Sequence, residues 1–235
     1  MLALAVDTAT PAVTAGLVEL EQAAAGANSP DTARPRTLAV RTLVDARAHA
    51  EALTPQILEC IAEAGVARTD IAAVVTGIGP GPFTGLRVGM ATAAAFGDAL
   101  GIPVHGVCSL DALAADCAEE LGPGDELLVV TDARRREVYS ARYRQQGARR
   151  ISGPEVGKPA ELDPAGATRI AGSAAHTALF ELPALPVQTP SPAGLVRVAA
   201  AALLSGAAPE PLVPLYLRRP DAVERSYRTL DRMGA

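Results

Sequence analysis

The sequence predicts an α/β protein of two similar lobes, each with a mixed β-sheet flanked by helices. The first half reads as three strands followed by alternating helices and strands, which is typical of parallel crossovers added to hairpins. The second half begins again with strand, tight turn and strand. In both openings an Asp ends an apolar strand and a Val follows six positions later, as Asp7 precedes Val13 and Asp132 precedes Val138. These observations together predict an internal duplication.

The chain opens with a predicted hairpin of strands at 2–6 and 12–19, because both segments are apolar and the turn-prone residues 8–11 separate them. Residues 21–37 contain Gly, Pro, Asn, Ser and Asp without periodicity, which predicts an elongated loop. A third strand is expected at 38–44.

Apolar residues then recur at three- and four-residue spacing, which predicts an amphipathic helix at 47–64 that ends at Gly65. Pro55 is expected to kink it. Its apolar face should consist of Leu53, Ile57, Leu58 and Ile61. The first half continues with a strand at 72–76, a helix at 84–100 and a strand at 103–107.

The second half is less regular, because residues 145–192 contain many Gly and Pro and predict no definite element. The expected elements are a helix at 109–120, strands at 126–131 and 137–144, a helix at 193–204 and a polar tail at 215–230.

Composition excludes several classes of protein. The 235 residues contain 21 Lys and Arg against 26 Asp and Glu, a net charge of -5, so a strongly basic nucleic-acid binder is not expected. Aromatic residues make up 3% of the chain, too few for the stacking surfaces of single-strand binders. Three scattered cysteines favour neither a disulfide framework nor a zinc site. The sequence shows neither a basic leader nor an apolar stretch of about 18 residues, which predicts a soluble, cytoplasmic protein.

The strongest local signal is the glycine-rich connection at 77–87, with Gly79, Gly81, Thr84 and Arg87. It lacks the Lys followed by Ser or Thr that ends a phosphate-binding P-loop, and its prolines have no amide N–H to offer a phosphate. A tight turn whose glycines allow close backbone approach is the favoured interpretation.

Small residues form a stripe along the predicted helix 84–100. Gly85, Gly89, Ala93 and Gly97 recur every four positions and share one face, so another helix can approach closely there. From this pattern alone, the neighbour is either the helix 47–64 of the same chain or a helix of a second subunit.

Asp7 and Asp132 end strands, where a carboxylate could hold a hydrated magnesium ion beside a nucleotide phosphate between the lobes. Asp residues at such positions more often cap turns. Arg134, Arg135 and Arg136 could attract phosphate, although a charged hairpin tip is usually a solvated turn.

Metal and nucleophile chemistry find little support in the sequence. His49, His105 and His176 are isolated, and Leu53 stands one turn after His49 where a second ligand would be needed, so no metal site is predicted. Ser109 and the cysteines lack a flanking base or a Gly-x-Ser-x-Gly elbow, so peptidase activity is not expected.

Five segments resemble the TsaB family, formerly YeaZ. They are VDTAT at 6–10, GPGPFTGLRVG at 79–89, GVCSL at 106–110, DARRREVY at 132–139 and PLYLR at 214–218. The segments extend over nearly the whole chain, and the glycine-rich run is highly specific in combination with the others.

The resemblance implies an actin-like fold, shared with Hsp70 and sugar kinases, with ribonuclease-H-like lobes at 1–106 and 107–235 and a tail that returns to the first lobe. In the family the first-lobe helices form the dimer contact. This implies that the helices at about 47–64 and 84–100, with the stripe of Gly85, Gly89, Ala93 and Gly97, are the partner interface.

Family members are non-catalytic partners in a heterodimer with TsaD, which transfers threonylcarbamoyl to an adenosine beside the tRNA anticodon, and they recruit the ATPase TsaE. TsaD binds its metal with paired histidines on the matching helix, where this chain offers only His49. The resemblance therefore implies no catalytic residue, metal or cofactor in this chain, with ATP and a metal used by partner subunits. It further implies tRNA contact through the complex, a homodimer in isolation and no membrane association.

An independent ATPase or small-molecule kinase of the actin-like superfamily stays open as an alternative, because Asp7 and Asp132 could line a nucleotide cleft. A kinase would also need a general base and adenosine-binding glycines, and 145–192 offers no clear candidate. The chain departs from the family pattern in its longer loop at 21–37 and in Pro82, where Ser is more usual. The superfamily's older name, glycoprotease, implies a proteolysis that no residue here supports.

Overall fold

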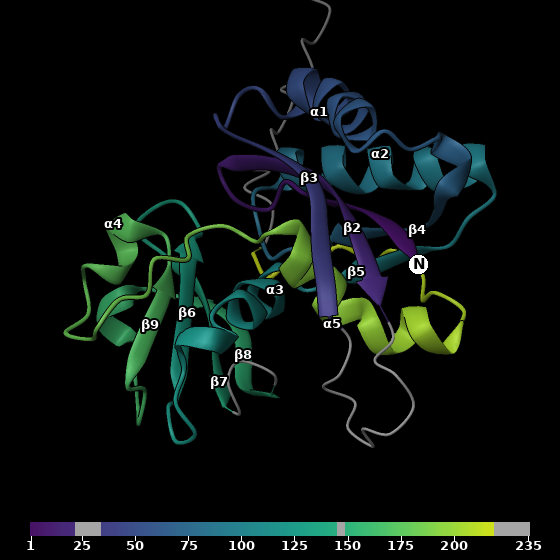
Figure 1. Ribbon diagram of the computed structural model, residues 1–235. Coiled ribbons are helices and arrows are strands. Elements are labelled where there is room, and N and C mark those ends of the chain that lie inside the picture. Colours follow the sequence, from purple (N-terminus) through teal and green to yellow (C-terminus); the bar gives the residue numbers. More distant parts are fainter. Residues whose placement is uncertain (22–33, 145–148, 219–235) are drawn as a thin grey trace, which may run out of the picture.

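The computed structural model describes residues 1–21, 34–144 and 149–218, and Figure 1 shows them as two lobes, each built on its own sheet. The first sheet has five strands and the second has four, and both mix parallel and antiparallel pairs. Helices flank the sheets, so the predicted α/β class with mixed sheets is confirmed. Within the described residues, no helix is both long and apolar enough to cross a membrane.

The first sheet is built around its central strand. Its strands are β1 (Leu2–Asp7), β2 (Ala12–Glu21), β3 (Arg34–Val44), β4 (Ile71–Gly77) and β5 (Val104–Val107), in the spatial order β3-β2-β1-β4-β5. Strand β1 pairs antiparallel with β2 and parallel with β4, so Leu4 lies between Leu17 and Val74. Because both faces of this strand are covered, its residues are almost continuously apolar rather than alternating.

Strand β3 begins earlier than the sequence predicts, because residues 34–37 belong to the strand and not to the loop. Arg36 pairs with Glu19, and Pro35 is accepted because β3 lies at the sheet edge, where a missing amide N–H removes no interior hydrogen bond. Residues 22–33 of the predicted loop lie outside the described residues.

Two helices cover one face of the first sheet. They are α1 (His49–Ala64) and α2 (Phe83–Leu100), and each ends at a glycine in the left-handed conformation, Gly65 or Gly101. Their core includes Leu4, Val6 and Leu17 from the sheet and Leu53, Ile57, Cys60 and Ile61 from α1. The prediction was wrong for Leu58, which is 40% exposed because it points away from the sheet.

A helix from the other end of the chain covers the opposite face. Helix α5 (Pro192–Ser205) begins at Ser191, whose hydroxyl accepts a hydrogen bond from the Gly194 N–H at 2.9 Å, and it confirms the predicted helix at 193–204. Ala3 and Ala5 of β1 point toward α5, whereas the alternate residues Leu4 and Val6 point toward α1 and α2. The C-terminal half of the chain thereby completes the first lobe (Figure 1).

The second lobe repeats the opening of the first. Its strands are β6 (Leu127–Asp132), β7 (Val138–Arg144), β8 (Arg149–Gly157) and β9 (Arg169–Gly172), in the order β8-β7-β6-β9, with α4 (Ala174–Thr177) after β9. The predicted strands at 126–131 and 137–144 are confirmed as β6 and β7, and they form an antiparallel hairpin like β1 and β2.

Other elements of the second half differ from the prediction. The helix expected at 109–120 ends earlier, as α3 (Ser109–Asp116) followed by a single 3-10 turn, η3 (Ala118–Glu120). Strand β8 was missed because it is a partly exposed edge strand interrupted by Gly153 and Pro154, which weakens the strand pattern. The other short 3-10 turns are η2 (Arg68–Asp70) and η4 (Pro159–Glu161).

The segment after α5 runs back between the lobes. Leu215 and Leu217 are partly buried against the second-lobe core, and the Leu215 N–H donates to the Ile78 carbonyl at 2.8 Å. The prediction of a polar tail is therefore wrong for 215–217, because these residues alternate into that core. The remainder, 219–230, lies outside the described residues.

Candidate functional site

Asp7 lies at the end of β1 and is only 1% exposed. One carboxylate oxygen accepts the Ala9 N–H at 2.9 Å, and the other accepts the Ser109 hydroxyl at 2.5 Å. Ser109 is the first residue of α3, so this contact joins the first strand to the helix that leads into the second lobe. We call Asp7, Ala9, Gly77 and Ser109 the Asp7 corner.

Gly77, the last residue of β4, closes the Asp7 corner from a third side. A Cβ atom at Gly77 would lie 1.8 Å from the Asp7 carboxylate and 2.6 Å from the Ser109 hydroxyl, so only glycine fits. Burial raises the pKa of the Asp7 carboxyl from 3.8 to about 6, although the hydrogen bonds from Ser109 and Ala9 and the nearby His49 lower it. The carboxyl is therefore enclosed by its own chain rather than presented to a cleft.

Thr8, the next residue, bonds directly to α2. Its hydroxyl donates to the Gly85 carbonyl at 2.7 Å and accepts from the Gly89 N–H at 3.1 Å, two groups that lie four residues apart in the helix. A Cβ at Gly89 would lie 2.3 Å from this hydroxyl. The glycines of α2 thus make room for the turn that follows β1.

The stripe of Gly85, Gly89, Ala93 and Gly97 is buried inside the chain, so the prediction that it meets a second subunit is contradicted. A Cβ at Gly85 would lie 2.9 Å from the Thr8 carbonyl oxygen, and one at Gly97 would lie 2.1 Å from the Val104 side chain. Ala93 belongs to the core shared with α1. The four-residue spacing predicted close approach correctly, but the neighbours are mainly a turn and a strand.

The glycine-rich connection is a tight turn packed against residues 8–11. Gly79 has a φ of 96°, and a Cβ at Gly81 would lie 2.3 Å from the Ala9 carbonyl oxygen. Thr84, in the first turn of α2, is exposed. The interpretation as a turn with close backbone approach is therefore confirmed for Gly81.

Arg87 belongs to an exposed cluster with Phe83 and Tyr216 that the sequence pattern did not predict. Its guanidinium lies 3.7 Å from the centre of the Phe83 ring, and its Nε donates to the Tyr216 hydroxyl at 2.8 Å. The two rings stack with their centres 5.0 Å apart. The four-residue spacing of Phe83 and Arg87 on one helix could have suggested their contact, but Tyr216 is 129 residues away from Arg87.

Asp132 occupies the equivalent position of the second lobe, but its side chain is 22% exposed. It accepts the Arg134 N–H at 2.7 Å, and its other oxygen lies 3.3 Å from the Arg134 guanidinium. The Nε2 atom of His176 lies 3.7 Å from one of the Asp132 carboxylate oxygens. Asp7 is enclosed by Ala9 and Ser109 and Asp132 is bonded to its own turn, so the contacts of these two carboxylates lend no support to the predicted nucleotide cleft.

His49 is a buried core histidine. One ring nitrogen lies 3.0 Å from the Ala46 carbonyl oxygen and the other 3.1 Å from that of Thr10. Both nitrogens are therefore engaged with backbone. In the part of the chain that the structure describes, His, Cys, Asp and Glu side chains form no group of three or more that could hold a metal ion.

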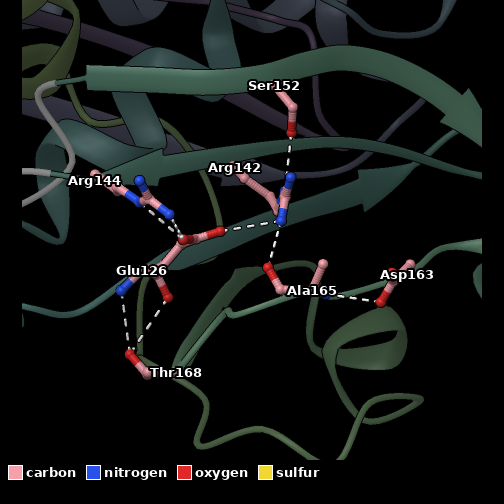
Figure 2. A network of polar contacts seen from close by, with 7 residues as sticks. All are labelled: Glu126, Arg142, Arg144, Ser152, Asp163, Ala165 and Thr168. Atoms are coloured by element: carbon pink, nitrogen blue, oxygen red, sulfur yellow. Dashed lines mark hydrogen bonds and ion pairs between the residues drawn. The ribbon is translucent and has the colours of Figure 1, made fainter.

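A second polar network holds the second lobe together (Figure 2). The Glu126 carboxylate, with a side chain only 6% exposed, pairs with Arg142 at 3.1 Å and with Arg144 at 2.9 Å. Arg142 also donates to the Ser152 hydroxyl and the Ala165 carbonyl, which links β7 to β8 and to the 163–168 segment. A shallow cavity of about 430 Å³ borders Arg142. Because its lining mixes both charge signs, it does not point to one ligand class.

Comparisons with known proteins match most of the chain to proteins of tRNA threonylcarbamoyladenosine formation and to YeaZ structures. A profile of the family described as TsaD, tRNA N6-adenosine threonylcarbamoyltransferase, matches residues 41–213. An uncharacterized protein of Mycobacterium tuberculosis is 54% identical over 219 residues, which cover 93% of this chain and 92% of the relative. The tRNA threonylcarbamoyladenosine biosynthesis protein TsaB of Escherichia coli is 33% identical over 99 residues, or 42% of each chain.

The solved structure of YeaZ from Pseudomonas aeruginosa superposes with a TM-score of 0.73 at 28% identity, covering 92% of this chain and 99% of that one. This likeness includes both lobes, and the five segments that suggested the family extend through both of them. The chain therefore belongs to the TsaB (YeaZ) family, whose curated members are named for tRNA threonylcarbamoyladenosine biosynthesis.

Proposed function

We propose that this chain is the partner subunit of a TsaD-type tRNA threonylcarbamoyltransferase, and that it supports threonylcarbamoyladenosine formation in the cytoplasm without performing the transfer itself. The names of the matching family and of its curated TsaB relatives support the pathway. On this proposal the chain pairs with TsaD, the pair recruits TsaE, and ATP and a metal are used by those partner subunits. The tRNA is then contacted through the complex.

The observation that best supports a non-catalytic role is that the Asp7 carboxylate is buried and hydrogen-bonded within the chain. A carboxylate that serves a metal or a nucleotide needs at least one accessible oxygen, but Asp7 is only 1% exposed and both of its oxygens accept hydrogen bonds from the chain itself. Burial also raises the pKa of this carboxyl, which weakens it as an anionic ligand. The position where an actin-like enzyme could hold a metal ion is used here for packing.

The outward face of α2 is the surface that best fits a protein partner. Ala91, Ala94 and Ala95 are exposed there, opposite the buried stripe, so another helix can approach its backbone closely. We call these three residues, with Leu58 of α1, the outer helix face. In isolation, self-association through the same face would give the expected homodimer.

The cluster of Phe83, Arg87 and Tyr216 at the beginning of α2 supplies an anchor beside the outer helix face. Phe83 is 46% exposed and Tyr216 is 40% exposed. Tyr and Arg dominate the binding energy of many protein interfaces. Because stacking already holds the Arg87 guanidinium, little side-chain freedom is lost on binding.

Light scattering on this chain, on TsaD of the same organism and on their mixture tests the proposal, with threonylcarbamoyl transfer to tRNA assayed on the same fractions. A one-to-one complex that restores transfer, with this chain inactive alone, is expected. If no complex forms and the chain hydrolyses ATP by itself, the proposal fails and an independent ATPase replaces it.

The variant Ala94→Arg tests the surface, because it adds a charged side chain to the outer helix face. We expect it to weaken the complex about tenfold or more, since its charge would lose water in the interface. Ala201→Arg on α5 is the matched control, an exposed alanine on the helix that covers the other face of the sheet. An unchanged affinity for Ala94→Arg would exclude this face.

A further inference from the structure

The turn between β6 and β7 has an uncommon backbone. Arg134, Arg135 and Arg136 have φ angles of 65°, 52° and 63°, all in the left-handed region that favours glycine. Non-glycine residues normally visit this region singly, and each costs free energy relative to glycine. We call these three residues the arginine tip. Three consecutive large side chains here are a local cost to stability, and such strain is found most often at functional sites.

Specific contacts hold the arginine tip in this conformation. The Ala133 N–H donates to the Glu137 carbonyl at 3.0 Å, and the Glu137 N–H donates to the Arg134 carbonyl at 2.9 Å. Arg218, from the end of the described chain, donates to the Ala133 carbonyl at 2.9 Å and lies 3.5 Å from the Glu137 carboxylate. The turn is therefore fixed by its own hairpin and by a distant segment.

The tip carries three consecutive basic side chains, although the whole chain carries a net charge of -5. All three arginines are exposed. Of the described side chains around the tip, Asp132 pairs with Arg134 and Glu137 pairs with Arg218. Three exposed arginines are therefore gathered on one turn that the surrounding contacts hold in place.

We propose that the arginine tip contacts the phosphate backbone of RNA. Guanidinium groups bind phosphate oxygens with paired hydrogen bonds, and several of them on a fixed turn fit a chain of phosphates better than a single one. The choice of RNA rests on the proposed function, because tRNA is the substrate of that complex. This chain would then help to position the tRNA rather than only support its partner.

The test uses glycine at the tip, because glycine removes the charge and relieves the strain together. In the full chain, Arg135→Gly with Arg136→Gly should raise the thermal midpoint, since glycine adopts these φ angles freely. Binding of labelled tRNA, measured by fluorescence anisotropy at several salt concentrations, should weaken. The slope of log affinity against log salt should fall by about one for each arginine removed. We therefore expect the double glycine variant to have a higher thermal midpoint and a lower affinity for tRNA than the wild type.

Two further variants separate the site from a general effect of charge. Arg68→Ala removes one exposed positive charge at a distant 3-10 turn and should leave the affinity for tRNA almost unchanged. Arg136→Lys keeps the charge and should retain most of the binding. If the double glycine variant is stable and binds tRNA like the wild type, the proposal is overturned.

The remaining outcomes identify other occupants. ATP and inorganic triphosphate are tested as competitors of the labelled tRNA. If either one binds the chain tightly by itself and displaces the tRNA at the concentrations where it binds, the tip is a site for small phosphates and the RNA proposal is overturned. If the variants lose TsaD in light scattering but keep tRNA, the tip is a protein contact, which also overturns it. If the variants lose tRNA binding but still form a normal complex with TsaD, the result supports RNA contact by the arginine tip. Failure of the wild-type chain to pair with TsaD overturns the proposed function separately.

Discussion

The two lobes open with hairpins of the same pattern and use them differently. In each hairpin an Asp is the last residue of the first strand. Asp7 is 1% exposed and bonded across the lobe to Ser109, whereas the Asp132 side chain is 22% exposed and bonded to its own turn. Two hairpins of similar pairing thus form one buried structural corner and one surface turn.

The residues that follow each Asp decide this difference. After Asp7 the chain continues with small side chains that pack against the glycine-rich turn and into α2. After Asp132 it continues with three arginines, which a core cannot accept without partners. Strand patterns therefore establish that two hairpins are equivalent, but the turn residues determine whether each is buried.

The largest expected effect comes from filling the Asp7 corner. Gly77→Ala should destabilise the fold by about 3 kcal/mol or more, because its Cβ would lie 1.8 Å from the Asp7 carboxylate and something must move. Urea unfolding measures this change. Gly124→Ala is the matched control, since nothing lies within 4 Å of a Cβ there. Equal stability of the two variants would show that the corner is not tightly packed.

The pH dependence of Asp7 gives the next effect. Because the folded-state pKa of about 6 lies above the ordinary 3.8, the folded protein keeps a proton here between these pH values that the unfolded chain has lost. The retained proton adds to the free energy of unfolding, and this contribution is fully present below about pH 4 and is lost as the pH rises through about 6. Its size is about 2–3 kcal/mol.

The variant Asp7→Asn measures the pH-dependent contribution of Asp7 to the free energy of unfolding, because an amide does not titrate. The unfolding free energy of the wild type minus that of Asp7→Asn should fall between about pH 4 and pH 6 and then level off. Unfolding by urea at each pH gives this difference. Parallel curves for the two proteins would mean that Asp7 is not desolvated.

Sequence patterns predicted the helices and strands whose apolar spacing and end residues can be seen within a short stretch of chain. The spacing of Leu53, Ile57 and Ile61 gave α1, and Gly65 and Gly101 end their helices in the left-handed conformation that the sequence favours there. The repeated strand, Asp and Val predicted both hairpins. Strand β8 was not predicted, because an exposed edge strand leaves little hydrophobic alternation.

The site was less predictable, because its contacts join distant residues. The stripe on α2 correctly indicated close approach, but nothing in a four-residue spacing says that Thr8 is the neighbour. Ser109 lies 102 residues from Asp7, and Tyr216 lies 129 residues from Arg87. Such pairs follow from strand order and lobe packing, which no local pattern contains.

A smaller effect is expected at the contact between the first hairpin and α2. Thr8→Val keeps the shape of the side chain but removes the hydroxyl that bonds Gly85 and Gly89. The loss should be about 1–2 kcal/mol, because two buried backbone groups lose a partner. Thr8→Ser keeps the hydroxyl and should lose less in the same chemical unfolding measurement. A Thr8→Val protein as stable as the wild type would contradict the role of this bond.

The smallest effect is expected at Asp132, and it completes the comparison with Asp7. Asp132→Asn should cost only about 0.5–1 kcal/mol, because an amide oxygen still accepts the Arg134 N–H and the exposed ion pair with the Arg134 guanidinium is worth little. Raising the salt concentration should shrink this cost further, since exposed charges are screened. Urea unfolding at low and high salt is the measurement. A cost equal to that of filling the Asp7 corner would mean that the second hairpin is as enclosed as the first, and the contrast between the lobes would then lie elsewhere.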